Sequence, residues 1–282
     1  MNIQDAKNNW LLQHDRLRPI GNPLPLLPRS IIGIDERQAC PDITLNPFRW
    51  ICQIESTGRT RRVATGTAYG TGCLIGRRTI LTAAHNFFVN GRKVFNRDVR
   101  ITLGTDGDRS RPVLGTYAVT NVETHSAYNP ARIVSPYDIA VVGLRAPYPA
   151  DEVANLGSQS WTEITASRLL HEQAFISGYP VDRPHARSRT EPANAVQFWH
   201  VEQVTDIAAG ELFYAVDTTP GQSGSPILVQ LPLENGRTDT VAVGIHTNAA
   251  SDLFPNRGLT IEGTIAAFVR HHYENNERGF TV

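Results

Sequence analysis

Short segments rich in β-branched and aromatic residues recur along the chain, with glycine, asparagine and aspartate between them. A first set occupies residues 50–55, 63–75, 99–103, 117–122 and 138–144, and a second set occupies residues 174–178, 195–204, 212–216, 227–231 and 241–246. Segments of this length between turn-forming residues are typical of β-strands. Two groups of about six such strands predict two small barrels, one after the other along the chain.

The end of the chain follows a helical pattern instead. Within residues 263–275, the apolar side chains of Ile265, Ala266, Phe268 and Val269 recur on one face of a helix. We therefore predict an all-β fold of two six-stranded antiparallel barrels with a C-terminal α-helix packed on the second barrel. The proline-rich residues 19–28 predict an extended linker, so residues 1–30 would form an N-terminal extension. The two barrels would then occupy about residues 31–150 and 151–282.

Length, charge and hydropathy exclude several classes of protein. The chain has 282 residues, of which 40% are hydrophobic, and this is enough to fill the cores of two small barrels. Its formal net charge of +0 provides no overall field for nucleic acid or a membrane surface, so neither is expected as a partner. No apolar run approaches the ~20 residues of a membrane span, and the N-terminal cluster at residues 10–12 is too short for a secretory signal.

The cysteine content bears on the cellular compartment. The three cysteines, Cys40, Cys52 and Cys73, cannot all pair within one chain. Three buried thiols in a reducing compartment are the simpler interpretation, and together with the missing signal they predict a cytoplasmic protein. A bridge between Cys40 and Cys52, and secretion with a leader absent from this chain, are the alternatives.

One serine lies between glycines in the sequence GQSGSP of residues 221–226. Gly221 allows a turn in which its own N–H and that of Ser223 face a single oxyanion, and Gly224 leaves room behind the serine. Ser223 is therefore the candidate nucleophile, although an ordinary surface turn has a similar composition.

A nucleophilic serine needs a base, and the base needs an acid that holds its tautomer. His85 follows two small residues in the sequence LTAAH, and Asp138 begins the apolar segment DIAVV. Taken singly, each is more often a structural histidine or a turn-forming aspartate. Their order with Ser223, separated by strand-like segments, predicts a catalytic triad.

These segments carry a resemblance to a known family. LTAAH, YDIAVV and TTPGQSGSPI resemble the three catalytic blocks of chymotrypsin-like serine proteases. The bacterial glutamyl endopeptidases are more similar still, through RSIIGIDER at residues 29–37, NPFRWICQIES at 46–56, ISGYP at 176–180, YAVDTTPGQSGSPI at 214–227 and GIHTN at 244–248. The similarity runs from about Ile31 to the C-terminus and implies the chymotrypsin-like fold and endopeptidase activity on protein or peptide substrates.

The resemblance also assigns roles. His85 would take the proton from Ser223, Asp138 would hold the imidazole, and the N–H groups of Gly221 and Ser223 would bind the oxyanion. No metal or organic cofactor is expected. Asn86 stands where relatives often carry a cysteine that braces the histidine loop, so that brace is missing here.

Substrate specificity has two interpretations. Thr218 and His246 fall at positions that bind the substrate's glutamate carboxylate in the S1 pocket of glutamyl endopeptidases, and both side chains can donate, His246 with added charge when protonated. Asp217 instead resembles the acid that attracts Arg or Lys in trypsin-like enzymes. We favour cleavage after Glu, or less well Asp, because a histidine at 246 would obstruct a long basic side chain.

RSIIGIDER resembles the start of mature glutamyl endopeptidases, which predicts processing near Arg29, Ser30 and Ile31 and a zymogen activated by another protease or a regulatory partner. Gln222 is uncharged, so a new N-terminal amine cannot pair with it as in trypsin. The alternatives are a partner-activated enzyme and an inactive protease fold used for binding.

Overall fold

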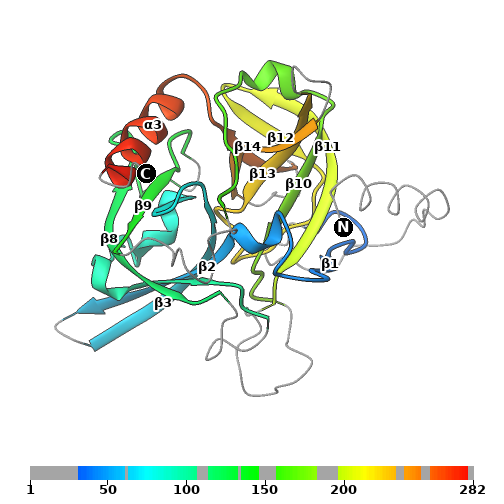
Figure 1. Ribbon diagram of the computed structural model, residues 1–282. Helices are drawn as coiled ribbons and strands as arrows, with labels where there is room; N and C mark the ends of the chain where they lie inside the picture. Colours follow the sequence, from blue (N-terminus) through cyan, green and yellow to red (C-terminus); the bar gives the residue numbers. More distant parts are fainter. Residues whose placement is uncertain are drawn as a thin grey trace.

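The computed structural model describes residues 31–60, 63–106, 114–132, 135–145, 157–182, 196–232, 238–248 and 255–278. Two antiparallel barrels lie side by side, with one α-helix near the C-terminus (Figure 1). The prediction of an all-β fold with two six-stranded barrels and a C-terminal helix is confirmed.

The first barrel is closed, with the strand order β2-β3-β4-β9-β8-β7. Its buried core includes Ile54, Leu74, Ile80, Ile101 and Val142. A short hairpin of β5 and β6 lies outside the barrel. The bounds are β2 Ile51–Thr60, β3 Val63–Leu74, β4 Thr79–Thr82, β5 Phe88–Val89, β6 Arg92–Lys93, β7 Val99–Leu103, β8 Thr116–Thr124 and β9 Ala140–Leu144.

The second barrel has the order β11-β10-β13-β14-β15-β12 and closes through pairing of β11 with β12. Its strands are β10 Gln173–Gly178, β11 Phe198–Ala208, β12 Glu211–Tyr214, β13 Pro226–Pro232, β14 Thr238–Asn248 and β15 Asn256–Thr260. The short strand β1 (Gln38–Ala39) pairs with β11 on its free edge. Within the described residues, the chain therefore pairs with the second barrel at β1 before it enters the first barrel.

Helix α3 (Gly263–Glu277) is two residues longer at its end than the predicted segment and packs on more than the predicted barrel. Its buried residues Ile265, Ala266 and Val269 share a core cluster with Leu81 and Val141, which belong to β4 and β9 of the first barrel. In Figure 1 the helix lies beside β8 and β9. The same cluster includes Ile245 of β14 and Leu259 of β15, so the helix packs on the second barrel, as expected, and on the first barrel as well.

The end of α3 also holds a turn of the first barrel. Glu277 accepts hydrogen bonds from the N–H groups of Arg77 (3.2 Å) and Arg78 (2.9 Å) and from Oγ1 of Thr79 (2.6 Å). These bonds tie the C-terminal helix to the turn between β3 and β4. That turn leads directly into the strand that precedes His85.

All three cysteines are free thiols. Cys52 and Cys73 are fully buried and Cys40 is partly buried, so the expectation of three buried thiols holds fully for two of them. Burial raises the pKa of Cys40 and of Cys52 to about 12, and it raises the pKa of Cys73 as well. Protonated thiols of this kind behave as small apolar side chains.

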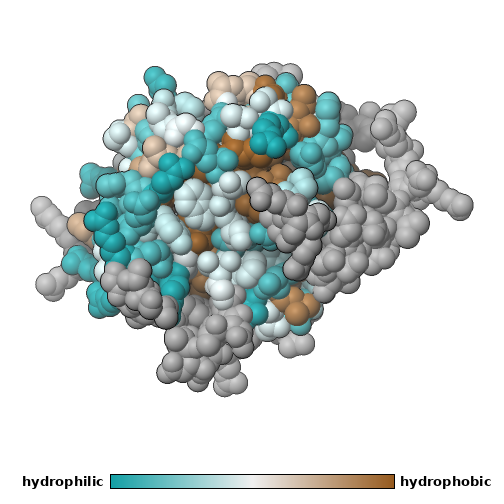
Figure 2. Space-filling view, turned by 45° about the horizontal axis from the view of Figure 1, so that its top comes forward, coloured by the Kyte–Doolittle hydropathy of each residue, from teal (hydrophilic) through white to brown (hydrophobic). Residues whose placement is uncertain are grey.

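Hydrophilic residues prevail over the first barrel and the helix on the face shown in Figure 2, and hydrophobic residues gather nearer its middle and top. Large apolar side chains that are well exposed include Ile34 (66%) and Phe95 (61%), on separate parts of the chain. Within the described residues, no helix is long and apolar enough to cross a membrane.

Candidate active site

His85 and Asp138 lie beside the ends of two neighbouring strands of the first barrel. His85 sits in the 3₁₀ helix Ala84–Phe87 just after β4, and Asp138 just precedes β9, which pairs with β4. Asp138 Oδ2 is 2.6 Å from His85 Nδ1, and Oδ1 accepts the His85 main-chain N–H at 2.9 Å. A carboxylate only accepts, so the proton of the neutral imidazole is on Nδ1 and Nε2 is left as the basic atom.

The surroundings favour the charged form of His85. Burial lowers the pKa of His85, but the charge of Asp138 and its hydrogen bond outweigh this, and the net pKa is raised. Asp138 is buried, whereas the His85 side chain remains 35% exposed. A base whose protonated form is stabilised in this way can take a proton from a hydroxyl.

The residues just before Ser223 specify a tight turn. The Gln222 N–H donates to Thr219 O at 3.1 Å, with Pro220 second and Gly221 third in the turn. Gly221 has φ +97°, and a type II turn requires a positive φ at its third position. Proline, here Pro220, is common at the second position of such turns. A Cβ on Gly221 would lie 2.4 Å from Tyr179 O, so close packing also demands glycine there.

The orientation of the Gly221 amide follows from its neighbours. The Val181 N–H donates to Pro220 O at 2.9 Å. Because a trans peptide places C=O and N–H on opposite sides, this bond turns the Gly221 N–H away from Val181. Within the described residues, neither the Gly221 N–H nor the Ser223 N–H donates to a main-chain carbonyl. Both amides are thus available to an oxyanion.

Ser223 lies where the two barrels meet. Its carbonyl accepts from the Thr71 N–H at 2.9 Å and from Asn86 Nδ2 at 2.9 Å. A Cβ on Gly224 would come within 2.1 Å of Thr82 Oγ1 and 2.2 Å of Thr71 O. Glycine at 224 therefore lets the turn that carries Ser223 approach the strand that leads to His85.

Asn86 joins the first barrel to the turn that carries Ser223. It is buried, and its Nδ2 donates to Thr82 Oγ1 at 3.0 Å as well as to the Ser223 carbonyl. A Cβ on Gly70 would lie 2.3 Å from Asn86 Cγ, so this amide fills the space beside Gly70. A hydrogen-bonded bridge between the barrels stands where the sequence predicted only a missing brace.

His246 lies on β14 next to the turn that carries Ser223, and its carbonyl accepts the Gly224 N–H at 2.7 Å. The ring is buried, and Nδ1 lies 2.8 Å from the Tyr214 hydroxyl. Burial, and next the charge of His85, lower the pKa of His246 to about 3, against a smaller opposing effect of the Arg257 main chain. His246 is neutral near pH 7, so it can supply an N–H but not the expected charge.

Thr218 is buried, and its hydroxyl has no hydrogen-bond partner within the part of the chain that the structure describes. The same holds for the Thr247 hydroxyl, one residue after His246. An unpaired buried hydroxyl costs about 1–3 kcal/mol and calls for an explanation. A ligand that accepts hydrogen bonds would provide one.

Asp217 binds the main chain near the N-terminus. Its Oδ1 accepts the Ile32 N–H at 2.8 Å and its Oδ2 accepts the Glu36 N–H at 2.9 Å. Burial raises the pKa of Asp217 to about 6, although these two hydrogen bonds oppose the rise. The side chain therefore serves as an anchor for residues 32–36.

His200 and Glu36 lie beside that anchor. Ligand atoms of Glu36, His200 and Asp217 lie within 4.8 Å of one another, as they do in metal sites. Both Asp217 oxygens and His200 Nδ1, which accepts the Asp217 N–H at 2.8 Å, are already engaged with main-chain donors. Anchoring of the chain explains this group without an ion.

Residues 42–258 match the family model described as Trypsin. The chain belongs to the trypsin family. The earlier resemblance to glutamyl endopeptidases is confirmed by a glutamyl endopeptidase of Bacillus licheniformis, which is 26% identical over 223 residues, 78% of this chain and 61% of the relative. An "Extracellular metalloprotease" of Bacillus subtilis is 27% identical over 233 residues, 80% of this chain and 64% of the relative. The match thus spans less than two thirds of these relatives.

A solved structure gives the same trypsin-family fold. The chain superimposes on "Structure of Glu endopeptidase in complex with MPD" with a TM-score of 0.66 at 24% identity, covering 86% of this chain and 98% of the other. A glutamyl endopeptidase of Staphylococcus epidermidis is 22% identical over 208 residues, 73% of this chain and 63% of the relative.

Two of the three predicted processing residues of this trypsin-family chain, Arg29 and Ser30, lie outside the described residues. Ile31 is the first described residue and is partly buried. The structure also brings in residues that the sequence did not single out. Val181 and Arg37 both contact the turn of residues 219–222, and only Arg37 stood in a motif already noted.

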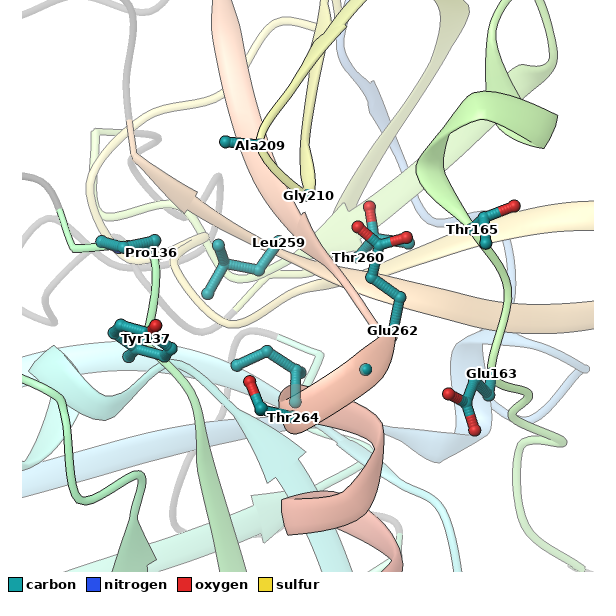
Figure 3. A pocket seen from close by; sticks show the side chains of 12 residues that line it. Pro136, Tyr137, Glu163, Thr165, Ala209, Gly210, Leu259, Thr260, Glu262 and Thr264 are labelled. Atoms are coloured by element: carbon teal, nitrogen blue, oxygen red, sulfur yellow. The ribbon is translucent and has the colours of Figure 1, made fainter.

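A cavity of about 450 Å³ separates the segment before Asp138 from the start of α3. Figure 3 shows Pro136 and Tyr137 on one side and Glu163 and Thr165 on the other, with β15 and the first residues of α3 between them. None of the predicted site residues of this trypsin-family chain lines it. Its lining consists of Pro136, Tyr137, Glu163, Thr165, Ala209, Gly210, Leu259, Thr260, Glu262, Gly263, Thr264 and Ile265.

Proposed function

We propose that the protein is a serine endopeptidase that uses Ser223, His85 and Asp138. The observation that carries the proposal is the double hydrogen bond of Asp138 to His85, at 2.6 Å and 2.9 Å, beside a serine turn whose Gly221 amide is oriented by Val181. A binding module has no need of an oriented imidazole and free turn amides together. The membership in the trypsin family supports the same chemistry.

The reaction follows from these positions. Ser223 Oγ attacks the scissile carbonyl while its proton passes to His85 Nε2, and Asp138 stabilises the imidazolium. The amides of Gly221 and Ser223 bind the oxyanion, and His85 then gives its proton to the leaving amine. Water, activated by the same imidazole, releases the acyl group from Ser223 and restores the free enzyme.

Cleavage after Glu is the proposed specificity, with Asp a poorer substrate. The unpaired buried hydroxyl of Thr218 and the neutral ring of His246 are donors suited to a carboxylate. Asp217 engages both carboxylate oxygens with the main chain at Ile32 and Glu36, which argues against the trypsin-like alternative of cleavage after Arg or Lys. The relatives named glutamyl endopeptidases support the same choice.

Cleavage of a random peptide library tests this specificity. We expect cuts after Glu that disappear in Ser223→Ala. Thr218→Val should raise KM for peptides with Glu before the cleaved bond more than for peptides with a neutral residue there. Ser167→Ala, a change at an exposed hydroxyl, is the matched control. Cuts after Arg or Lys that are lost on Asp217→Ser would establish the trypsin-like alternative instead.

Maturation and export belong to the same proposal. We propose that residues 1–30 are removed near Arg29, Ser30 or Ile31, and that the protein acts outside the cell, since one relative is named as extracellular. The cytoplasmic expectation finds no support among the relatives. Comparison of the full chain with variants that start at Ser30 or Ile31 tests the zymogen: equal activity without N-terminal trimming would show that the extension is not inhibitory.

A further inference from the structure

The guanidinium group of Arg37 lies beneath the turn that carries the oxyanion amides. Its side chain is fully buried, with 0% relative exposure. Nη1 donates to Thr219 Oγ1 at 2.7 Å and to Gln222 Oε1 at 3.2 Å. These two acceptors are the first and last residues of the turn whose third residue is Gly221.

Two carboxylates hold the guanidinium in place. Asp35 accepts from Nε at 3.0 Å and from Nη2 at 2.9 Å, and Asp182 accepts from Nη1 at 3.1 Å and from Nη2 at 2.7 Å. Burial disfavours the charge, but the bonds to Asp35 and Asp182 outweigh it and raise the pKa of Arg37. A planar fork bound on both edges by carboxylates has a fixed orientation.

The same group closes the turn from both sides. Thr219 Oγ1 donates to Asp182 Oδ1 at 2.6 Å, and Gln222 Oε1 accepts the Thr219 N–H at 3.0 Å in addition to Arg37. Gln222 lies between Gly221 and Ser223, so its side chain fixes the peptide planes on either side. Asp182 also follows Val181, whose N–H orients the Gly221 amide.

We infer that Arg37 is a positioning residue for the oxyanion amides, and that residues 32–37, bound by Asp217 at one end and by the turn at the other, act as a strap that keeps the turn competent. The inference rests on the proposed function. Gln222 is uncharged, so the turn has no acid with which an N-terminal amine could pair, and the buried guanidinium supplies the missing cation from within the chain.

The test compares Arg37→Ala, Arg37→Lys and Thr219→Val with the wild-type chain, all matured in the same way. Arg59→Ala is the control, because Arg59 forms an exposed ion pair with Asp98 on the first barrel at 2.8 Å. Arg37→Ala should lower kcat by about 10²–10³-fold, the loss expected for an oxyanion donor, and change KM by less than about 3-fold. Arg37→Lys keeps the charge without the fork and should recover part of kcat.

A second measurement separates positioning from general stability. A peptide aldehyde with the P1 residue that wild type prefers forms an oxyanion with Ser223, whereas the corresponding peptide alcohol does not. Arg37→Ala should weaken binding of the aldehyde by about 10²-fold or more relative to binding of the alcohol. An unchanged aldehyde-to-alcohol ratio, or a loss of kcat no larger than in Arg59→Ala, would overturn the inference.

Thr219→Val keeps the test decisive if Arg37→Ala does not fold, because it removes only the hydroxyl that joins Arg37 and Asp182 to the turn. In this variant we expect the ratio of the affinity for the aldehyde to the affinity for the alcohol to fall by about 10-fold. An unchanged ratio would again overturn the inference. Failure of the proposed function is a different result: the wild-type chain itself would not react with a fluorophosphonate or cleave peptides.

Discussion

His85 and Asp138 are placed by adjacent strands of one barrel, whereas the turn that carries Gly221 and Ser223 is placed by segments from several distant parts of the chain. Thr82 pairs with Ala140 across β4 and β9, and this pairing brings His85 and Asp138, the proposed base and acid, close together. The turn instead depends on Arg37, 182 residues away from Thr219, and on Val181 and Asp182. The base and acid are therefore built into the first barrel, while the oxyanion site depends on the N-terminal strap.

The difference matters for regulation. The strap of residues 32–37 directly follows the predicted processing region near Arg29, Ser30 and Ile31. A change at the N-terminus can therefore reach the oxyanion turn without disturbing the bond between Asp138 and His85. Mutations in the two regions should accordingly have separable kinetic effects.

Removing the nucleophile or the base should have the largest effect. Ser223→Ala and His85→Ala should each lower kcat by about 10⁶-fold, because triad members act as a unit. Thermal unfolding of both variants should remain close to wild type, since both side chains are partly exposed. Activity near wild type in either variant, measured on a peptide that the native chain cleaves, would refute the triad.

Asp138→Asn tests the pair of His85 and Asp138 in the first barrel, independently of the turn that carries Ser223. The amide favours the wrong imidazole tautomer, so kcat should fall by about 10⁴-fold. Asp138 also raises the pKa of His85 against the effect of burial, and activity needs the neutral ring. The acid limb of kcat/KM should therefore move to lower pH in the variant, and an unshifted limb would contradict the assigned pair.

Asp217→Asn tests the strap. The pKa of Asp217 is raised to about 6 from 3.8, so the native state binds this proton more tightly than the unfolded chain. The contribution of Asp217 to the free energy of unfolding is full below about pH 4 and decreases as the pH rises through about 6. Denaturant unfolding of wild type and variant should show a stability difference that shrinks between about pH 4 and pH 7.

The same variant sharpens the specificity assignment. If Asp217 anchors Ile32 and Glu36, the residue preferred before the cleaved bond should stay the same in Asp217→Asn. A switch of preference away from basic residues would show that the carboxylate binds substrate. A stability difference independent of pH would argue against the buried anchor.

Asn86→Ala should have the smallest effect, because it removes one bridge between the two halves. The Ser223 carbonyl keeps its bond from Thr71, so we expect a loss of about 1–2 kcal/mol in the free energy of unfolding and a modest fall in kcat. Asn96→Ala is the control, since Asn96 donates a similar bond to Thr120 O at 2.8 Å on the exposed side of the first barrel. Equal effects of the two variants on kcat would remove Asn86 from the site.

Much of the fold could be predicted because its strands carry β-branched and aromatic residues at the expected spacing. Two barrel strands were not predicted from the sequence, and each has a physical reason. β4 (Thr79–Thr82) is four residues long and wholly buried, so it lacks an alternating pattern. β15 (Asn256–Thr260) reads as a loop because it contains asparagine, arginine and glycine. A Cβ on Gly258 would lie 2.4 Å from Ile245 O, so tertiary packing requires glycine there, and this glycine makes the segment resemble a loop.

The site was predictable where local sequence encodes it. Pro220 and Gly221 specify the turn themselves, and the order of His85, Asp138 and Ser223 indicates their chemistry. The support of that turn was not predictable, because the bond from Arg37 to Gln222 spans 185 residues and depends on how the second barrel closes. The contact of α3 with the first barrel was not predictable for the same reason, since its apolar stripe packs on side chains of both barrels.

Covalent labelling with a fluorophosphonate, located by mass spectrometry, tests the central assignment most directly. The matured wild-type chain should gain one adduct, on Ser223, at a rate that falls by several orders of magnitude in His85→Ala. Arg37→Ala should react more slowly than wild type but at the same residue. Adduct formation on another residue, or none on a folded wild-type chain, would contradict the assignment of Ser223 as the nucleophile.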